Sequence, residues 1–346
     1  MDDVSSGPRY LDRLDQLLGK PSPTGPLAVD LFAGCGGLSL GFEAQGFQTI
    51  GYEIDADCCI TYSSGLAGNA HQVRLSPESS LPPAPVLIGG PPCQPFSVGG
   101  DQKGRQDSRD GLPTFVTAVR KLRPLIFLFE NVRGVLYRNK SYFSQFIDEL
   151  RELGYAVDVR LMNAVNYGVP QNRERVIAVG HSGGFRFPAP EKFRVTAGEA
   201  LGSLASSTPE GSRFLTASMD EYVARYERAS NCINPRDLEL RKPARTLTCR
   251  NLAGATGDMQ RLRLPDGRRR RLVLREAARL QSFPDWFTFA GGETSQFNQV
   301  GNAVPPLFAY ALAGSVRAYL NLPPPFAESN ATTDYWGSQA PLPIGE

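Results

Sequence analysis

The chain has 346 residues, of which 41% are hydrophobic, and its 37 basic and 35 acidic side chains leave a net charge of +2. This length is enough for one large domain with a smaller insert or for two domains, and the composition predicts a globular protein with a substantial core. No apolar run approaches the roughly 18 residues of a membrane span, and residues 1 to 10 contain no apolar stretch, so we expect a soluble cytoplasmic protein.

The cysteines and histidines argue against a metal centre. The six cysteines lack the paired C-x-x-C spacing of zinc sites, and nothing in their pattern suggests a disulfide framework. The chain has two histidines, His71 and His181, which disfavours histidine-centred catalysis. We therefore expect no bound metal and a reducing compartment.

Basic residues are concentrated in one part of the chain. Residues 241 to 279 contain twelve Lys or Arg and three Asp or Glu, whereas the remainder has a net charge of −7. Such asymmetry predicts a polyanionic partner for this stretch, although a solvated run of charge would look the same. Of the 37 basic residues 31 are Arg, which suits recognition of phosphates and base edges.

Strand and helix patterns alternate along most of the chain. Residues 1 to 26 are polar and rich in Pro and Gly, apart from a short helix expected at residues 11–18. Further on, strands are expected at 27–32, 49–53, 86–88, 125–130, 156–160 and 176–179, and helices at 37–45, 56–64, 114–122, 141–153, 274–281 and 306–319. This alternation predicts an α/β fold with a mainly parallel sheet and helices on both faces.

The alternation is lost near Phe185, and no clear repeat is present from there to about Thr248. We interpret this stretch as an inserted second domain. The expected organisation is an N-terminal extension (1–26), the first part of the main domain (27–184), the insert (185–280), a return to the main domain (281–321) and a disordered tail (322–346).

A glycine-rich turn follows the first expected strand. Residues 30 to 38 read Asp-Leu-Phe-Ala-Gly-Cys-Gly-Gly-Leu, and the glycines allow a tight turn and a close approach to a ligand. Ser39 replaces the third glycine of a G-x-G-x-x-G phosphate loop, which favours a nucleoside over a pyrophosphate. Glu53, at the end of the second strand, can hold both hydroxyls of a ribose. Together these features favour S-adenosylmethionine over NAD.

A cysteine follows the third expected strand in the run Gly-Gly-Pro-Pro-Cys-Gln-Pro-Phe-Ser, residues 89 to 97. The two prolines before it fix φ at about −65° and remove two backbone donors. Cys93 should therefore lie on a stiff loop at the carboxyl end of a strand, where open α/β sheets place their ligands. A lone free cysteine is more often a small buried hydrophobic residue. The flanking prolines and glycines favour a nucleophile instead.

Two further strands place charged groups at the same edge of the sheet. Glu130 follows five apolar residues and should be partly desolvated, which suits a proton donor, although a Glu that caps the next segment has the same pattern. Arg173 and Arg175 precede another strand. Alternate arginines point to one face and suit holding Glu130 or a carbonyl oxygen, although a surface ion-pair ladder has the same spacing.

These motifs, in this order and spacing, resemble the DNA (cytosine-5)-methyltransferase family of the bacterial restriction–modification type. The resemblance covers residues 27–179 and 241–319. It rests on residues 30–38, Glu53, Pro91-Pro92-Cys93-Gln94, Glu130-Asn131-Val132, 171–175, 243–246, 279–284 and 299–305. It implies a Rossmann-like S-adenosylmethionine-dependent methyltransferase sheet with a smaller target-recognition domain at 185–280. In one departure, no Asp that would contact the adenine amine is evident around residues 71 to 80.

The resemblance implies sequence-specific methylation of cytosine C5 in double-stranded DNA. Cys93 would add to C6 of a cytosine flipped out of the duplex. Glu130 would protonate or hydrogen-bond N3, and Arg175, with Arg173 supporting it, would hold O2. C5 would then take the methyl group of S-adenosylmethionine, with S-adenosylhomocysteine as product, and loss of the C5 proton to an unidentified base would expel Cys93.

The resemblance also implies contact residues and partners. The cofactor residues are Phe32, Ala33, Gly34, Cys35, Gly36, Gly37, Leu38, Glu53, Ile54, Pro92, Asn302 and Ala303. The DNA contacts are Gln94, Ser97, Arg109, Arg245, Arg250, Arg268, Arg269, Arg270 and Arg271. A glycine-rich loop at 98–111 is expected to close over the base. We expect a monomer at the bacterial nucleoid, with a restriction endonuclease of the same specificity as a candidate partner.

Three alternatives compete with this interpretation. The tRNA-directed branch of the family carries a Cys-Phe-Thr element, which is missing between Phe185 and Ala290. A catalytically inactive DNA-binding paralogue would have lost Cys93, Glu130 or Arg175, and all three are present. An NAD-linked oxidoreductase is disfavoured by the incomplete glycine pattern. The recognition sequence does not follow from the residues of the insert.

Overall fold

The computed structural model describes residues 10–92, 111–137, 140–229, 231, 236–253 and 259–323. Its strands are β1 (Leu27–Leu31), β2 (Gln48–Glu53), β3 (Asn69–Gln72), β4 (Val86–Gly89), β5 (Ile126–Val132), β6 (Ala156–Asn163), β7 (Gln171–Asn172), β8 (Glu174–His181), β9 (Ala244–Arg245), β10 (Arg261–Arg263) and β11 (Arg269–Arg271).

The α-helices are α1 (Tyr10–Leu18), α2 (Gly37–Ala44), α3 (Ala56–Gly65), α4 (Leu112–Leu122), α5 (Lys140–Glu152), α6 (Ala197–Leu201), α7 (Ala217–Ala229), α8 (Cys249–Ala253), α9 (Leu274–Leu280), α10 (Glu293–Asn302) and α11 (Pro306–Tyr319). Short 3-10 helices are η3 (Arg133–Leu136), η4 (Ala164–Tyr167) and η5 (Gly202–Ser206).

The central sheet has seven strands in the order β3-β2-β1-β4-β5-β8-β6. The first five pair in parallel, and β8 runs antiparallel to both of its neighbours. The chain passes from β1 to β2 on one side and returns to β4 on the other, so the strand order reverses between β1 and β4. Open sheets form a ligand crevice beyond the strand ends at such a point. The predicted α/β fold with a mainly parallel sheet is confirmed.

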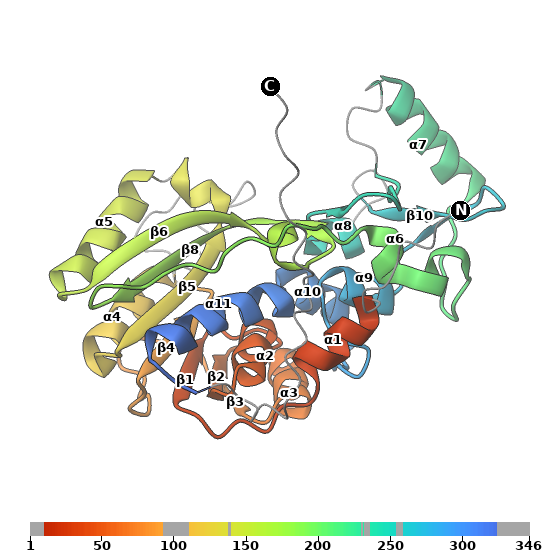
Figure 1. Cartoon of the computed structure of the whole chain (residues 1–346). Helices are drawn as coiled ribbons and strands as arrows, with labels where there is room; N and C mark the ends of the chain where they lie inside the picture. The colour runs from red at the N-terminus through yellow and green to blue at the C-terminus, as the bar shows by residue number, and fades with distance from the viewer. Residues whose placement is uncertain are drawn as a thin grey trace, which may run out of the picture.

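Helices cover both faces of this sheet because its central strands are apolar on both sides. In β5, Phe127 and Phe129 face one way, into a cluster with Phe115 of α4 and Phe146 of α5. The alternating residues of β5 belong to a second cluster with α2 and α11. In Figure 1, α4 and α5 lie at one end of the molecule, and α2 and α11 lie against the sheet.

Part of the predicted insert, α7 with β10 and β11, lies at the end of the molecule opposite to α4 and α5 (Figure 1). In it, α7 lies beside the antiparallel strands β10 and β11, and Val223 is the buried residue of α7. Other parts of the insert pack on the main domain, since Leu201, Leu247 and Leu272 share one apolar cluster with Phe308 of α11. The short strand β9 also pairs with β7.

The predicted strands and helices are present, with ends shifted by at most three residues. The sequence patterns missed β3, an edge strand that is mostly exposed, and they missed α7 and α10. Within the described ranges, no helix combines the length and apolar character needed to cross a bilayer. The predicted disordered tail lies, from residue 324 on, outside the described residues.

Candidate active site

A cavity of about 1050 Å³ lies where β1, β2, β4 and β5 end. The predicted cofactor residues that line it are Phe32, Ala33, Gly34, Cys35, Leu38, Glu53, Ile54, Pro92, Asn302 and Ala303. Glu130, predicted as the catalytic acid, lines the same cavity. The structure therefore brings the predicted cofactor residues and the predicted acid together at the crevice where the strand order reverses.

Glu53 is held at this cavity by main-chain N–H groups. Its Oε2 accepts a hydrogen bond from Gly34 N at 2.9 Å, and its Oε1 accepts from Ile54 N at 2.7 Å and Asp55 N at 2.9 Å. These donors fix the carboxylate but do not use all of its lone pairs. Three of its about four lone-pair sites are used, and the remaining one, on Oε2, can accept a hydrogen bond from a hydroxyl group of a ligand such as a ribose.

Two apolar side chains border the cavity next to Glu53. Ile54 is 48% exposed, and Phe32 is half-buried. Phe32 has a φ of 60°, in the left-handed region that a bulky residue rarely adopts and that costs on the order of 1–3 kcal/mol. Since both side chains line the cavity, a flat apolar ligand group has surfaces on which to pack.

Gly36 and Gly37 do not line the cavity, so the structure does not place them as cofactor contacts. Gly36 has a φ of 88° and precedes α2, and a Cβ there would lie 2.6 Å from Leu66 Cδ1. A Cβ at Gly37 would collide with the carbonyl oxygen of Val304. Their small size lets α2 pack closely against its neighbours, a packing role in place of the predicted contact.

Glu130 forms an ion pair with Arg175 across β5 and β8. Arg175 Nε lies 2.6 Å from Glu130 Oε1, and the two side chains are 11% and 12% exposed. Burial removes water from the pair, so its charge attraction is stronger than on the surface. Arg175 therefore orients Glu130 at the cavity and leaves its Oε2 without a protein partner among the described contacts.

The segment that leads to Cys93 is anchored beside this ion pair. Asn131 Nδ2 donates to Pro91 O at 3.1 Å, and Gly111 N donates to Pro92 O at 2.9 Å. Residues 93 to 110 lie outside the described residues, and with them four predicted site residues, Cys93, Gln94, Ser97 and Arg109, and most of the predicted loop 98–111. Both ends of that segment lie at the cavity, which Pro91, Pro92 and Gly111 line.

The cysteines that the structure describes are poor nucleophiles. Burial raises the pKa of Cys35 to about 12 and that of Cys59 to about 11. Burial likewise raises the thiol pKa of Cys58 and of Cys249. Because the thiolate is the reactive form, none of these four has the environment of a nucleophile.

Arg173 does not line the cavity but lies buried behind it, with 1% of the residue exposed. Its guanidinium donates to Leu247 O at 2.7 Å, Gly301 O at 3.2 Å and Ala303 O at 3.0 Å. Burial, with the charge of Arg175, lowers the pKa of Arg173 well below its usual value. Arg173 therefore supports the site through the backbone on both sides of Asn302, not through Glu130.

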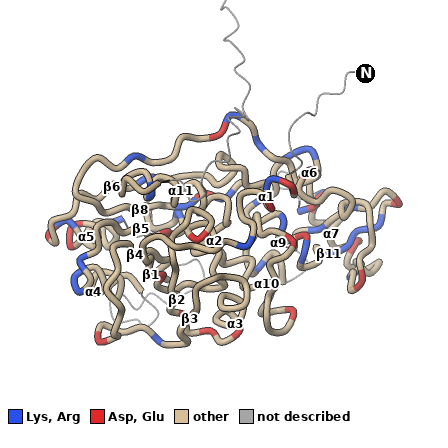
Figure 2. The backbone as a smooth tube through the Cα atoms, turned by 60° about the horizontal axis from the view of Figure 1, so that its bottom comes forward, with Lys and Arg blue, Asp and Glu red and all other residues tan. Residues whose placement is uncertain are grey.

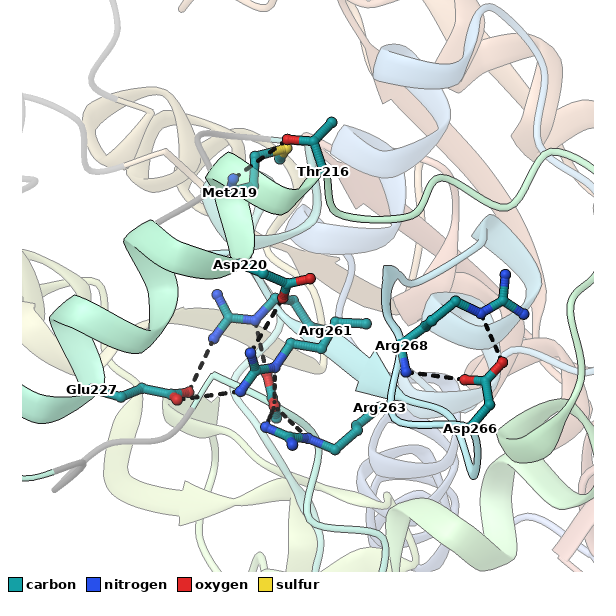
Figure 3. Close-up of polar contacts among 10 residues, drawn as sticks. Thr216, Met219, Asp220, Glu227, Arg261, Arg263, Asp266 and Arg268 are labelled. Carbon is teal, nitrogen blue, oxygen red and sulfur yellow. Dashed lines mark hydrogen bonds and ion pairs between the residues drawn. The ribbon is translucent and has the colours of Figure 1, made fainter.

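Most of the predicted basic patch is neutralised inside the insert. Asp237 contacts Arg261 at 2.8 Å, Arg263 at 3.2 Å and Arg269 at 2.8 Å. Figure 3 shows Arg261 and Arg263 in this network, which Glu227 joins from α7. Although burial acts to raise the pKa of Asp237, its hydrogen bonds to Arg261 and Arg269 lower it below its usual value. In Figure 2, basic and acidic segments lie together over α7 and β11.

The predicted DNA contact of Arg270 is wrong. Arg270 and Glu276 are 0% exposed and form two hydrogen bonds, of 2.8 Å and 2.7 Å. A guanidinium in a buried ion pair cannot meet a phosphate in solution. Arg269 is 11% exposed and is held by Asp220, Glu227 and Asp237, so it too is a poor candidate.

Four other predicted DNA contacts are more accessible. Arg245 and Arg250 are exposed, and Arg271 is half-buried. The side chain of Arg268 is 59% exposed, although it pairs with Asp266 and lies over the ring of Phe214. These four side chains reach the surface of the insert.

Sequence reasoning missed several cavity residues. Asp30, in the glycine motif itself, lines the cavity and is 1% exposed. Burial, together with the nearby charge of Glu53, raises the pKa of Asp30 to about 7 although Ser39 donates to it. Asn298 and Arg74 also line the cavity, but Asn298 lies just before the motif at 299–305 and the segment after β3 carried no motif, so neither residue was singled out. Among the described residues, no cluster of His, Cys, Asp or Glu could hold a metal ion.

The sequence model of the family "C-5 cytosine-specific DNA methylase" matches residues 28–318. The chain belongs to this family. The Type II methyltransferase M.AplI of Arthrospira platensis is 56% identical over 313 residues, covering 90% of this chain and 89% of that protein. M1.HphI of Haemophilus parahaemolyticus, also named a Type II methyltransferase, is 35% identical and covers 83% of this chain and 86% of its own length.

The fold of this DNA cytosine-5 methyltransferase agrees with a solved relative. The S. pombe Dnmt2 methyltransferase superposes with a TM-score of 0.67 over 86% of this chain and 99% of that one, at 14% sequence identity. The family uses S-adenosylmethionine, so the cavity around Glu53 is the place to test for that cofactor.

Proposed function

We propose that this DNA cytosine-5 methyltransferase acts through a covalent bond between Cys93 and C6 of a cytosine flipped out of double-stranded DNA. The observation that carries the proposal is that Glu130, oriented by Arg175, lines the same cavity as Glu53 and the glycine turn. One cavity thus has room for a nucleoside cofactor and a proton donor for the target base.

The residues at the cavity fit S-adenosylmethionine. The fixed carboxylate of Glu53 can accept from a ribose hydroxyl, and Phe32 and Ile54 suit the adenine ring. At the other end, Asp30 Oδ1 is buried without a hydrogen-bond partner among the described residues, which suits a cation. When bound, the cofactor supplies an electrophilic methyl group.

The residues of the chain then act on the cytosine. Attack of the Cys93 sulfur on C6 makes C5 electron-rich, and Glu130 aids it by hydrogen-bonding or protonating N3. Arg175, which does not itself line the cavity, keeps Glu130 in place, and its assignment to O2 follows from the family resemblance alone. After C5 is methylated, loss of its proton restores the double bond and expels Cys93. The raised thiol pKa values of Cys35, Cys58 and Cys59 support Cys93 as the nucleophile.

We also propose that residues 185–280 recognise the DNA sequence. The lobe of α7, β10 and β11 projects from the main domain (Figure 1). The candidate contacts with bases and phosphates are Arg245, Arg250, Arg268 and Arg271, with Gln94, Ser97 and Arg109 on the cysteine side. Phosphate contacts make the affinity fall as salt rises.

The relatives suggest the biological setting. M.AplI and M1.HphI are named Type II methyltransferases. By this likeness we propose that the enzyme protects DNA against an endonuclease of the same specificity. We propose separately that it acts as a monomer.

Two experiments test these proposals. Expression in a host without cytosine methylation, followed by bisulfite sequencing of its DNA, should reveal one methylated sequence; unmodified DNA would refute the activity. An oligonucleotide with 5-fluorocytosine at that target should stay bound to the protein under denaturing conditions when cofactor is present. No trapped complex, or equal trapping by the Cys93→Ala variant, would refute the covalent step.

A further inference from the structure

A buried row of side chains leads away from the cofactor cavity. It begins at Asp30 of β1, which lines the cavity, and ends at Glu43 of α2. Between them lie the hydroxyl groups of Ser39, Tyr62 and Thr49, from α2, α3 and β2. Each of the five residues is at most 5% exposed. Apart from Asp30, no residue of this row has a role in the proposed methylation.

Four hydrogen bonds join the two carboxyl groups. Ser39 Oγ lies 2.7 Å from Asp30 Oδ2. The Tyr62 hydroxyl lies 2.9 Å from Ser39 Oγ and 2.9 Å from Thr49 Oγ1. Thr49 Oγ1 lies 2.6 Å from Glu43 Oε1. Every oxygen in the row is therefore within hydrogen-bond distance of the next.

A count of hydrogens shows what the row requires. Each hydroxyl group has one hydrogen to donate, so Ser39, Tyr62 and Thr49 supply three hydrogens for four hydrogen bonds. With both carboxyl groups ionised, one pair of buried oxygens would face each other without a hydrogen. With both protonated, one hydrogen would lack an acceptor in the row. The row is complete when one of the two carboxyl groups carries a proton.

The surroundings favour keeping that proton. Burial and the charge of Glu53 raise the pKa of Asp30, whereas the hydrogen bond from Ser39 lowers it. The net result is a pKa of about 7. Burial raises the pKa of Glu43, against hydrogen bonds from Thr49 and from the N–H groups of residues 67 and 68. Both carboxyl groups therefore hold a proton more readily than a carboxyl group in water does.

The Asp30 end of the row lies at the cavity. Asp30 lines the cavity, and its Oδ1 is buried without a hydrogen-bond partner among the described residues. A positive charge in the cavity favours the ionised form of Asp30. S-adenosylmethionine carries positive charge, and this step rests on the proposed function in taking the cavity as its binding site.

We propose that Asp30 and Glu43 share one proton through Ser39, Tyr62 and Thr49, and that binding of the cationic cofactor moves it from Asp30 to Glu43. Asp30 gives its proton to Ser39, whose own hydrogen passes to Tyr62; Tyr62 passes its hydrogen to Thr49, and Thr49 passes its hydrogen to Glu43. Four O–H bonds break and four form. The carboxylate thus appears at the cavity without release of a proton to solvent.

Titration calorimetry with S-adenosylhomocysteine, which keeps the ammonium group of the cofactor, tests this transfer at about pH 6, below the pKa of Asp30. The unmodified protein should give the same binding enthalpy in two buffers that differ in ionisation enthalpy. Tyr62→Phe interrupts the row, so Asp30 has to release its proton to the buffer. The binding enthalpy measured for Tyr62→Phe should therefore differ between the two buffers. The affinity of this variant for S-adenosylhomocysteine should fall up to about tenfold per pH unit below pH 7.

Two variants provide controls. Tyr167→Phe removes another tyrosine hydroxyl, which donates to Pro188 O away from the cavity, and should behave like the unmodified protein. Thr49→Val interrupts the row near Glu43 and should behave like Tyr62→Phe. Proton release by the unmodified protein, or buffer-independent binding by both interrupted variants, would overturn the proposal. Absence of binding by the unmodified protein would instead count against the proposed cofactor site.

The unliganded protein gives a second, independent measurement. Its infrared spectrum at about pH 6, below the pKa of Asp30 and well above that of exposed carboxyl groups, should contain the carbonyl band of one protonated buried carboxyl group. Tyr167→Phe should keep the band. No band, or the intensity of two groups, would overturn the shared proton whether or not the cavity binds a cofactor.

Discussion

Replacing Arg270 by methionine should destabilise the protein strongly. Arg270 and Glu276 are 0% exposed, and their two hydrogen bonds of 2.8 Å and 2.7 Å join β11 to α9. Removing one partner of a buried ion pair typically costs about 3–5 kcal/mol, because the other charge is left without compensation. Arg270 also donates to Leu204 O and Ser207 O, so further buried acceptors lose a donor. A domain stable by about 5–15 kcal/mol would remain folded at low temperature.

Urea unfolding of Arg270→Met, Glu276→Leu and the double variant measures this effect. We expect each single change to cost about 3–5 kcal/mol and the double change to cost much less than their sum, since an apolar pair leaves no buried charge. Arg268→Met is the matched control: its side chain is 59% exposed, and its surface ion pair should contribute little to stability. Additive single effects would refute the reasoning.

DNA binding separates this structural role from the one predicted from the sequence. At temperatures where the variant is folded, Arg270→Met should keep the salt dependence of DNA affinity of the unmodified protein. Arg268→Met should lower the slope by about 1 if that side chain meets a phosphate. A lowered slope with unchanged stability in Arg270→Met would restore the original assignment.

Three further predictions concern the site and the insert. Glu53→Gln should weaken S-adenosylhomocysteine binding about 10-fold to 100-fold, because a hydrogen bond to a charged group is worth about 1.5–3 kcal/mol; calorimetry checks this, and unchanged affinity would refute the ribose assignment. Arg175→Lys should lower kcat by at least about 100-fold with unchanged cofactor affinity, because Lys cannot reproduce the planar contact with Glu130; single-turnover kinetics distinguish the two parameters, and normal turnover would refute the orienting role. Asp237 has a lowered pKa, so its contribution to stability is present above its unfolded pKa of about 4 and is lost as pH falls through its folded value. Asp237→Asn should therefore be less stable at pH 7 and lose less stability on acidification, as urea unfolding at several pH values would show; parallel pH profiles would contradict it.

Much of the fold could be predicted because its buried strands are unambiguous. The run before Glu130 is apolar on both faces of the sheet, and a strand buried on both sides has that pattern. Glu53 and Glu130 could be singled out for the same reason: each is the acid at the end of such a strand, and parallel strands end at one edge. The helix α7 could not be predicted, since Val223 is its buried residue and a polar helix has no apolar period.

The charge of the insert shows a different limit. A count of charges along the chain assigns the basic residues between 241 and 279 to a partner, because it includes only residues that are close in sequence. In the structure, Arg261 and Arg269 are paired with Asp237 and Glu227, which precede the counted stretch. Ion pairs between distant segments depend on how α7 and β10 pack, and this packing cannot be inferred from the spacing of charged residues along the sequence.

Gln171 of β7 and Arg173, which lies between β7 and β8, join the insert to the site. Leu247 N donates to Gln171 Oε1 at 2.8 Å, and Leu247 O accepts from Arg173 at 2.7 Å. The same guanidinium holds Gly301 O and Ala303 O, the carbonyl groups on either side of Asn302 at the cavity. A displacement of the backbone between Arg245 and Arg250 would therefore be transmitted to Asn302 through one buried side chain. A buried arginine without a carboxylate partner is costly; here it joins the segment proposed to meet DNA to the wall of the cofactor cavity.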